Sequence, residues 1–344
     1  MKLVVNIQNF TNFALRNVFW GTRFAVTNSF NKNLYSGMRF LSVGLLILMF
    51  SCRSGVKPEL NETPTRGNIT ISVDESFQPL IDTEIFTFTH LYKSAKIKPE
   101  YKPEYDVIND FMNDSVRVIV TSKKLTDYQI QSLRDSLIIA RTTTFAYDAM
   151  AFIINKENRD TLIRYSNLQD MFLGKIKSWK DINPKSKLNK INLIFDNTRS
   201  GNIRYFKDLF EVSDTLGENF FAVKNNQEVI EYVSRNPDAM GIISVNWISD
   251  QDDSLSMSFI KKVNVVAISQ KFINDGSYYR PYQGSIYDRS YPFVREIYFV
   301  SRETFTGLGS GFIQWATGEQ GQRIVLKSGL VPSTMPIRLV QIKN

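Results

Sequence analysis

Short runs rich in β-branched residues alternate with helical patterns along most of this chain. The stretch "NITISVD" places Ile69, Ile71 and Val73 at every second position, and "FQPLIDTEIFTFTHLY" then carries apolar side chains at helical spacing. The alternation recurs in "DVINDFMND" and "SVRVIVTS", "DYQIQSLRDSL" and "LIIAR", "INLIFDN" and "SGNIRYFKDLF", and "NQEVIEYVSRN" and "MGIISVNW". A period of two indicates a strand, and a period near 3.6 indicates a helix. The chain is therefore predicted to be an α/β protein with largely parallel sheets, in which ligands bind beyond the carboxyl ends of the strands.

The charge distribution argues against a nucleic-acid partner. Basic residues exceed acidic residues by 42 to 34, which gives a formal charge of +8. Residues 1 to 51 hold five of the basic residues and no acidic one, so the rest of the chain has 37 basic against 34 acidic residues. A nearly balanced folded part does not favour a polyanion as partner. We expect no nucleic-acid binding.

An apolar run with a positive start precedes the single cysteine. Met38 and Arg39 lead into eleven uncharged residues, Phe40 to Phe50, which are followed by Ser51 and Cys52. Such a helix rises about 16 Å, roughly half of a hydrocarbon core, so the pattern favours a secretory signal over a membrane span. A buried core helix is the alternative. The "MFSC" sequence resembles a lipoprotein lipobox, which implies that Cys52 becomes the acylated N-terminus of the mature chain.

The region around this signal divides into three predicted parts. Residues 1 to 37 are interpreted as a misassigned start ahead of Met38 or as a long n-region, since they contain no acidic residue and no clear element. Residues 38 to 51 are the expected signal peptide. Residues 52 to 66, which include "RSGVKPELNETPTR", are polar and are the expected lipid-anchored tether. Folding should begin near Gly67.

The sequence lacks the motifs of common enzymes. His90 is the single histidine, so metal clusters of the His/Cys type and Ser-His-Asp or Cys-His catalysis lack their parts. Neither GxGxxG nor the GxxxxGK[ST] phosphate loop occurs. Asp74, Glu75 and Asp196 leave a carboxylate-based hydrolase open as the minority alternative. We expect that the protein is not an enzyme and that it binds no cofactor and no metal.

Three strand-to-helix loops offer hydroxyls and backbone N–H groups. Ser76 lies at the expected N-cap of the first helix, Ser122 follows a strand after Thr121, and residues 200 to 202 ("SGN") begin another helix. Each loop alone is typical of a plain helix cap. Because the first N–H groups of a helix lack internal partners and carry partial positive charge, three such loops that converge would bind an anion.

With these loops in place, the chain resembles the substrate-binding proteins of ABC-type phosphate transporters, in particular the lipoprotein forms of Bacteroidetes-like bacteria. The resemblance runs from about Gly67 to the C-terminus and depends on the order and spacing of "ITISVDESFQPL", "SKKL", "FAYDAMAFIIN", "LQDMFLGKIKSWKDINP", "RSGN", "NPDAMGIISVNW", "YPFVREIYFVS" and "GFIQWATGEQGQRIVLKSGLVP". It implies a two-lobe type II periplasmic-binding-protein fold, in which each lobe is a mostly parallel sheet flanked by helices and two strand crossovers join the lobes. We expect lobe 1 at 67–147 and 264–344, lobe 2 at 148–263, and crossovers near Phe145 to Asn155 and Val263 to Ser269.

The resemblance also implies the ligand and its contacts. Inorganic phosphate or another small oxyanion would bind in the cleft, held by Ser76, Ser122, Ser200, Gly201 and Asn202, where Asn202 replaces the family's threonine.

The chain departs from the family pattern at several charged positions. Where better-known members carry an arginine four residues before Ser200, this chain has Asp196, and Arg199 is the expected substitute. Asp74 and Glu75 add further acids. One acid favours phosphate over sulfate by accepting the phosphate proton, whereas three would argue against either anion. We expect most of these acids to point away from the cleft.

The leading hypothesis is a monomeric, lipid-anchored receptor on the periplasmic side of a bacterial membrane. By lobe closure it would capture phosphate and deliver it to an ABC-type permease. A non-transport protein on the same fold, which senses another ligand or docks a partner, is the second hypothesis. The tyrosine-rich stretch "GSYYRPYQGSIYDRSYP" leaves a similar choice open between a docking surface and a loop that covers the lobe carrying the C-terminal helix.

Overall fold

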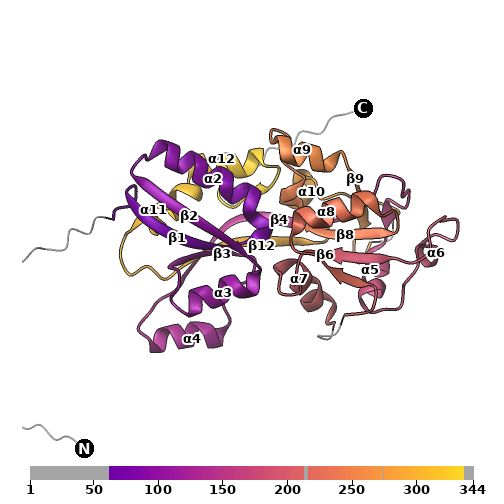
Figure 1. Ribbon diagram of the computed structural model, residues 1–344, viewed down its shortest axis with the longest axis horizontal. Coiled ribbons are helices and arrows are strands. Elements are labelled where there is room, and N and C mark those ends of the chain that lie inside the picture. Colours follow the sequence, from indigo (N-terminus) through magenta and orange to yellow (C-terminus); the bar gives the residue numbers. More distant parts are fainter. Residues whose placement is uncertain (1–61, 213–215, 274, 337–344) are drawn as a thin grey trace, which may run out of the picture. The chain divides into compact units, whose positions relative to one another are not determined.

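The computed structural model describes residues 62–212, 216–273 and 275–336 (Figure 1). The predicted signal peptide, Cys52 and nearly all of the tether lie outside the described residues, so these predictions stay predictions. Leu60–Asn344 form one compact unit, and the description below refers to it. In the described ranges, no helix combines the length and apolar composition that crossing a membrane requires.

Three parallel strands form the centre of the first lobe. β1 (Gly67–Asp74) lies between β2 (Ala95–Lys102) and β3 (Val118–Thr121) and pairs with both in parallel. The helices of this part are η1 (Glu75–Phe77), α2 (Gln78–Leu91), α3 (Glu104–Met112) and α4 (Asp127–Asp135). The strand and helix predicted at the start of the folded region are confirmed. Because neighbouring parallel strands end at the same edge of a sheet, the loops that follow β1, β2 and β3 lie side by side at that edge.

β4 (Arg141–Asn155) is long enough to run through both lobes (Figure 1). Its first part pairs antiparallel with β12 (Val294–Ser301), and its last part pairs antiparallel with β8 (Ala239–Ser244). β12 also pairs with β3, so the strand order is β2-β1-β3-β12-β4-β8-β6-β7. The expected crossover at Phe145 to Asn155 lies within β4.

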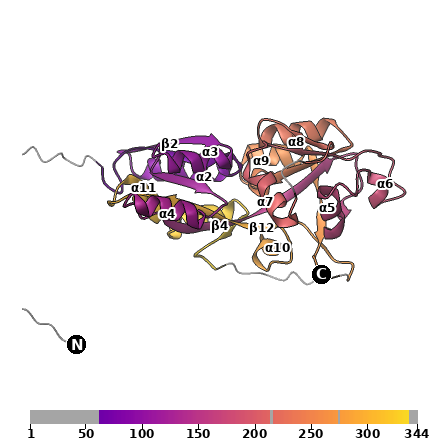
Figure 2. The same ribbon diagram turned by 90° about the horizontal axis from the view of Figure 1, so that it is seen from below.

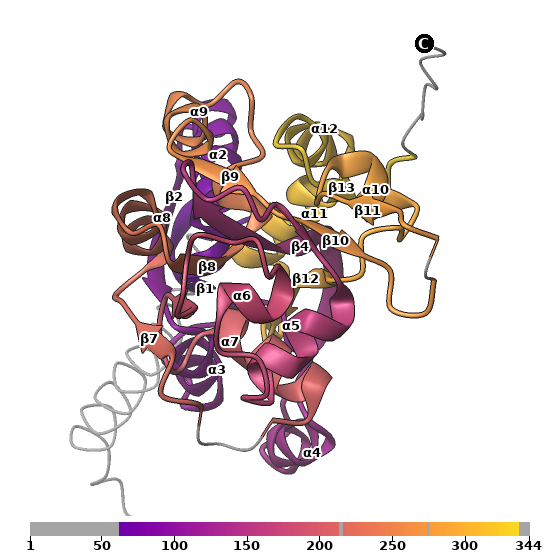
Figure 3. The ribbon, with the colours of Figure 1, turned by 90° about the vertical axis from the view of Figure 1, so that its right-hand side faces the viewer.

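The second lobe repeats the parallel arrangement. β6 (Asn192–Phe195) lies between β7 (Phe220–Ala222) and β8 and pairs with both in parallel. Its helices are α5 (Tyr165–Phe172), α6 (Trp179–Ile182), α7 (Gly201–Phe210), α8 (Asn226–Arg235), η2 (Val245–Trp247) and α9 (Ser254–Ile260). α8 covers one face of the strands, and α5 and α7 lie together on the other (Figures 1 and 3).

The chain returns to the first lobe later than expected. β9 (Val263–Val265) pairs with the last residues of β4, and β10 (Ala267–Ser269) pairs with β5 (Leu162–Ile163) and β11 (Tyr278–Tyr279) in a separate sheet. The predicted crossover at Val263 to Ser269 is therefore wrong, because a short β-rich run carries no mark of its pairing partner. The return runs past α10 (Gln283–Tyr287), which lies against β4 (Figure 2), into β12. The lobe boundary at 147/148 stays a proposal, and we propose that the boundary predicted at 263/264 lies after β11, since β9 and β10 still pair with strands of the second lobe.

The C-terminal part packs back onto the first lobe. It contains α11 (Leu308–Ala316), α12 (Glu319–Lys327) and β13 (Val331–Pro332), and β13 pairs with β4. The tyrosine-rich stretch holds this part in place. The Tyr291 hydroxyl donates to the Met150 carbonyl at 2.7 Å, and Gln283 Nε2 donates to the carbonyls of Leu326 and Leu330 at 2.8 and 2.6 Å. These contacts join β4 to the end of α12.

A cluster of aromatic rings positions α7. The ring centroid of Phe206 lies 5.1 Å from that of Phe152 on β4, 5.0 Å from that of Phe172 on α5 and 5.1 Å from that of Phe293. All four rings are buried. The start of α7 is therefore fixed relative to the crossover strand by packing rather than by its loop alone.

We predict that Phe206→Ala lowers the free energy of unfolding by about 3–5 kcal/mol, because it deletes a fully buried ring and its aromatic contacts. Urea unfolding followed by fluorescence measures this loss. Leu209→Ala on the same helix is the matched control, since Leu209 is 38% exposed and its truncation should cost under about 1 kcal/mol. Equal losses in the two variants would contradict the role given to the cluster.

Candidate functional site

Ser76, the expected ligand residue of the first loop, contacts residues of the second lobe. Asp74 ends β1 and caps η1, where its Oδ1 accepts from the Ser76 N–H at 3.0 Å. Ser76 therefore lies inside the 3₁₀ turn and not at the expected helix N-cap. Its Oγ donates to Asn202 Oδ1 at 3.1 Å, and Asn246 Nδ2 donates to its carbonyl at 3.2 Å. Ser76 is thus buried between elements of both lobes.

The expected anion loop begins α7. Ser200 is the N-cap of α7, and its Oγ donates to Asp196 Oδ1 at 2.6 Å. Asn202 Nδ2 donates to Asp196 Oδ2 at 3.2 Å and to Asn226 Oδ1 at 3.0 Å. Gly201 faces the first lobe at close range, because a β carbon there would lie 2.7 Å from Asp74 Oδ2. A side chain at position 201 would require the carboxyl groups of Asp74 and Glu104 to shift, so glycine permits the closest approach of the two lobes.

Ser122 belongs to a group of donors around Glu104, the first residue of α3. Glu104 Oε1 accepts from Thr121 Oγ1 and from the Ser122 N–H at 3.0 Å each, and from Ser122 Oγ at 2.6 Å. Arg204 of α7 donates through Nε to Oε2 and through Nη2 to Ser122 Oγ at 3.1 Å. Burial opposes ionisation, but Arg204 and these hydrogen bonds outweigh it and hold the pKa of Glu104 below its usual range. Glu104 is therefore ionised at neutral pH.

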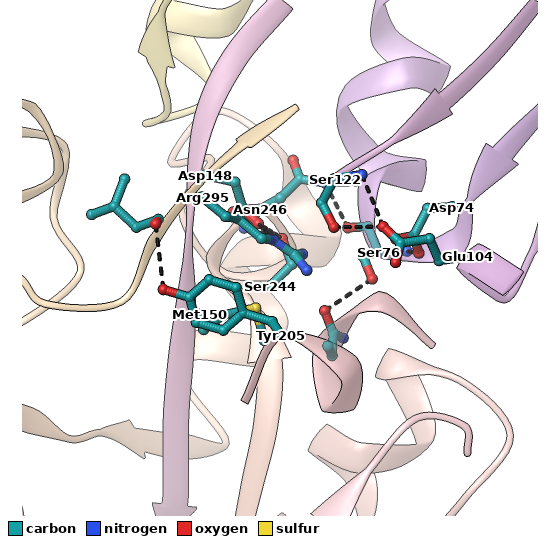
Figure 4. A network of polar contacts seen from close by, with 12 residues as sticks. Asp74, Ser76, Glu104, Ser122, Asp148, Met150, Tyr205, Ser244, Asn246 and Arg295 are labelled. Atoms are coloured by element: carbon teal, nitrogen blue, oxygen red, sulfur yellow. Dashed lines mark hydrogen bonds and ion pairs between the residues drawn. The ribbon is translucent and has the colours of Figure 1, made fainter. Parts of the chain in front are cut away.

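A buried ion pair joins the neighbouring strands β12 and β4. Arg295 Nε on β12 donates to Asp148 Oδ2 on β4 at 2.8 Å, and the Ser244 Oγ also donates to this carboxylate. Arg295 is 5% exposed and Asp148 is fully buried. The guanidinium carbon lies 4.8 Å from the ring centroid of Phe77. Figure 4 shows how this pair and the first-loop residues lie together.

The remaining nitrogens of Arg295 are unusual. Among the described residues, neither Nη1 nor Nη2 has a hydrogen-bond partner, although both are buried. A buried guanidinium that leaves two donors unused is costly unless something else accepts from them. These two nitrogens are therefore the strongest local indication of an anion-binding position.

Arg199 lies elsewhere. Its Nη1 donates to Asp106 Oδ1 at 2.6 Å, and its side chain is 56% exposed. The guanidinium thus lies at the rim, where solvent screens it, and the buried cation of the site is Arg295. Arg199 was predicted because it adjoins Ser200 in sequence, whereas Arg295 comes from a strand about a hundred residues further along the chain.

The expectation that most of the three acids point away from the cleft is wrong. Asp74 and Asp196 are 0% and 2% exposed, and Glu75 accepts from Asn226 Nδ2 of the other lobe. The period of a strand does not decide their direction, because Asp74 and Asp196 lie where β1 and β6 end and serve as acceptors for the turns that follow. Asp74 Oδ2 has no partner among the described residues.

Burial raises the pKa of all three carboxyls. Burial and the Glu104 charge raise the pKa of Asp74 to about 7, and burial and Asp196 raise the pKa of Glu75 to about 8. Burial raises the pKa of Asp196 to about 6, against the hydrogen bond from Ser200. At neutral pH the site therefore carries fewer negative charges than its carboxyl count indicates, and a protonated carboxyl donates a hydrogen bond.

Comparisons with known proteins agree on the fold. A family model described as a PBP superfamily domain matches residues 59–320. The phosphate-binding protein PstS of Borreliella burgdorferi is 25% identical over 296 residues, which cover 83% of this chain and 98% of that protein. The PstS of Staphylococcus epidermidis is 29% identical over 241 residues, 69% of this chain and 73% of that protein.

Solved structures give the same architecture. A candidate phosphate ABC transporter substrate-binding protein from Clostridium perfringens, with bound phosphate, has a TM-score of 0.66 at 21% identity and covers 78% of this chain and 100% of that one. An ABC-type phosphate transport receptor from Vibrio cholerae has a TM-score of 0.58 at 20% identity, over 77% of this chain and 100% of that one. The two-lobe α/β fold is thereby confirmed.

We predict that the ligand-free protein loses stability as pH rises from about 4 to about 8. Because the folded state holds protons on Asp74, Glu75 and Asp196 that the unfolded state has released, it binds more protons across this window, and the free energy of unfolding must fall. Thermal unfolding across that range measures the slope.

The double variant Asp74→Asn with Glu75→Gln should reduce this slope, since neither side chain can ionise, while Asp196 and the buried Glu84, whose pKa values burial also raises, keep part of it. Asp252→Asn at an exposed position is the control and should keep the wild-type slope. A wild-type slope that persists in the double variant would show that other groups titrate.

Proposed function

Because the chain belongs to the PBP superfamily, we propose that it is an extracytoplasmic solute-binding protein that captures inorganic phosphate between its lobes and delivers it to an ABC-type permease. The observation that carries this proposal is the buried Arg295, with Nη1 and Nη2 unpartnered among the described residues. An oxyanion accepts from such a fork in a bidentate manner. The names of the relatives support phosphate as that oxyanion.

The arrangement of hydroxyls supports the same ligand. Ser76 and Ser200 are buried at the contact of the two lobes. Their hydroxyls and that of Ser122 donate to other side chains in this structure, and an anion that replaced those acceptors would receive neutral donors from both lobes, with the N–H groups at Gly201 and Asn202 beside them. An anion that accepts hydrogen bonds from both lobes binds the closed form more tightly than the open form. It therefore shifts the equilibrium toward the closed form. We propose binding without turnover, which the names of the relatives as phosphate-binding proteins support.

The acids favour an anion that still carries a proton. Asp74 Oδ2 is buried and unpartnered within the described part of the chain, so it can accept the proton of phosphate when ionised or donate to an oxygen when protonated. Sulfate offers no proton at neutral pH. The site should therefore select phosphate over sulfate and weaken as pH rises through about 8, where Glu75 also ionises.

We predict that phosphate binds the wild-type protein and that sulfate does not. Arg295→Lys should weaken phosphate binding by about 100-fold, because lysine retains the ion pair with Asp148 but lacks the fork of two further donors. Titration calorimetry on the full chain, purified in detergent and dialysed free of ligand, measures both.

Arg302→Lys is the control, since Arg302 is also buried and its Nη1 donates to the Phe111 carbonyl, away from this site. It should bind phosphate as the wild type does. Failure of the wild type to bind phosphate would instead favour the second hypothesis, a protein of the same fold that senses a different ligand or partner. The observation that supports this second hypothesis is the group of carboxyls around Asp74, which would repel an anion when ionised.

We also propose that lipidation of Cys52 anchors the protein to the membrane. Metabolic labelling with radioactive palmitate should label the wild type and place it in the detergent phase of a Triton X-114 extraction, because acyl chains partition with hydrocarbon. Cys52→Ser should remove the label. Ser54→Ala, which leaves both the thiol and the "MFSC" sequence in place, is the matched control. Labelling that persists in Cys52→Ser would contradict the assignment.

A further inference from the structure

The Glu104 carboxylate occupies a cradle of donors from both lobes. Thr121 and Ser122, at the end of β3, direct two hydroxyls and one N–H to Oε1. Arg204 of α7 adds Nε to Oε2 and Nη2 to Oε1, the latter at 3.4 Å. A charged carboxylate that receives five donors, two of them from a guanidinium, is held as proteins hold a bound oxyanion.

Glu104 also lies next to the position indicated by Arg295. A β carbon on Gly201 would lie 2.7 Å from Asp74 Oδ2 and 3.0 Å from Glu104 Oε1, so the two carboxyls meet at the start of α7. Arg295 is among the charges that lower the pKa of Glu104, and Figure 4 draws Ser76 and Ser122 in the same network. An anion held by the free nitrogens of Arg295 would therefore meet the negative charge of Glu104 within the same buried network.

A cavity gives Glu104 a place to move to. It measures about 260 Å³ and lies between α3 and α7, with Glu104 and Arg204 on its wall. Lys123 and Arg199 also line it. A carboxylate that rotated into this cavity would exchange the cradle for two cations near solvent and would keep its charge compensated.

We propose that Thr121, Ser122 and Arg204 form an oxyanion subsite, and that Glu104 is its resident occupant, which an entering phosphate displaces toward the cavity. This inference rests on the proposed function and adds a device to it. The side chain is an internal competitor. In the absence of ligand, Glu104 accepts the hydrogen bonds of Arg204 and holds the lobes together. Its competition sets the phosphate concentration at which phosphate displaces it.

The test compares phosphate affinity in Glu104→Gln and Glu104→Ala with that of the wild type by titration calorimetry on the full chain. Removal of a competitor should tighten phosphate binding by about tenfold or more. Asp106→Asn is the matched control, because Asp106 lies on the same helix and pairs with Arg199 without entering the cradle. Circular dichroism confirms that each variant is folded, and the glutamine variant retains the side-chain volume.

A second readout does not depend on phosphate capture. Acetate is the carboxylate that Glu104→Ala has lost, so it should raise the melting temperature of this variant and leave the wild type and Asp106→Asn unchanged. If the wild type binds no phosphate, the proposed function fails, and the acetate shift alone then decides whether the cradle is an oxyanion subsite. Phosphate affinities in both Glu104 variants that equal or fall below that of the wild type would overturn the competitor role, and absence of the acetate shift would overturn the subsite.

Discussion

The buried pair of Arg295 and Asp148 is the interaction on which the rest of the structure depends. It joins the neighbouring strands β12 and β4, and β4 continues from the sheet of one lobe into the sheet of the other. Burying both charges is costly, and the Coulomb attraction and the Ser244 hydrogen bond only partly offset this cost. Two nitrogens of Arg295 then remain without a partner among the described residues. The pair therefore holds a cation, at a cost to stability, at the point where both lobes meet.

The loops around this cation follow from the parallel strands. β1 and β3 end on one side and β6 ends on the other, so the turns after them bring Ser76, Ser122 and Ser200 to the same region. Phe206 and its aromatic neighbours hold α7 against β4, and Gly201 permits α7 to approach Asp74. Ligand contacts from two rigid lobes are the basis of capture by closure in this fold.

Much of the fold could be predicted from the sequence, because each strand and helix carries its own periodicity. The alternation of residues 69, 71 and 73 predicts β1, and the hydroxyl after it predicts a loop with donors. Arg295 could not be found in this way, since its partner Asp148 lies 147 residues away and no spacing rule connects them. Glu104 was missed for a related reason: a glutamate in the first turn of a helix is usually a simple favourable charge near the N–H groups. The directions of Asp74 and Asp196 were mispredicted because residues at a strand end, where the turn begins, no longer follow the period of the strand.

The central claim is that the free nitrogens of Arg295 hold the ligand. A crystal structure of the protein grown with phosphate tests this most directly. The account predicts phosphate oxygens within hydrogen-bond distance of Arg295 Nη1 and Nη2, with Ser76 and Ser200 as further donors. Phosphate bound at the rim beside Arg199, with Nη1 and Nη2 of Arg295 still unpartnered, would contradict it.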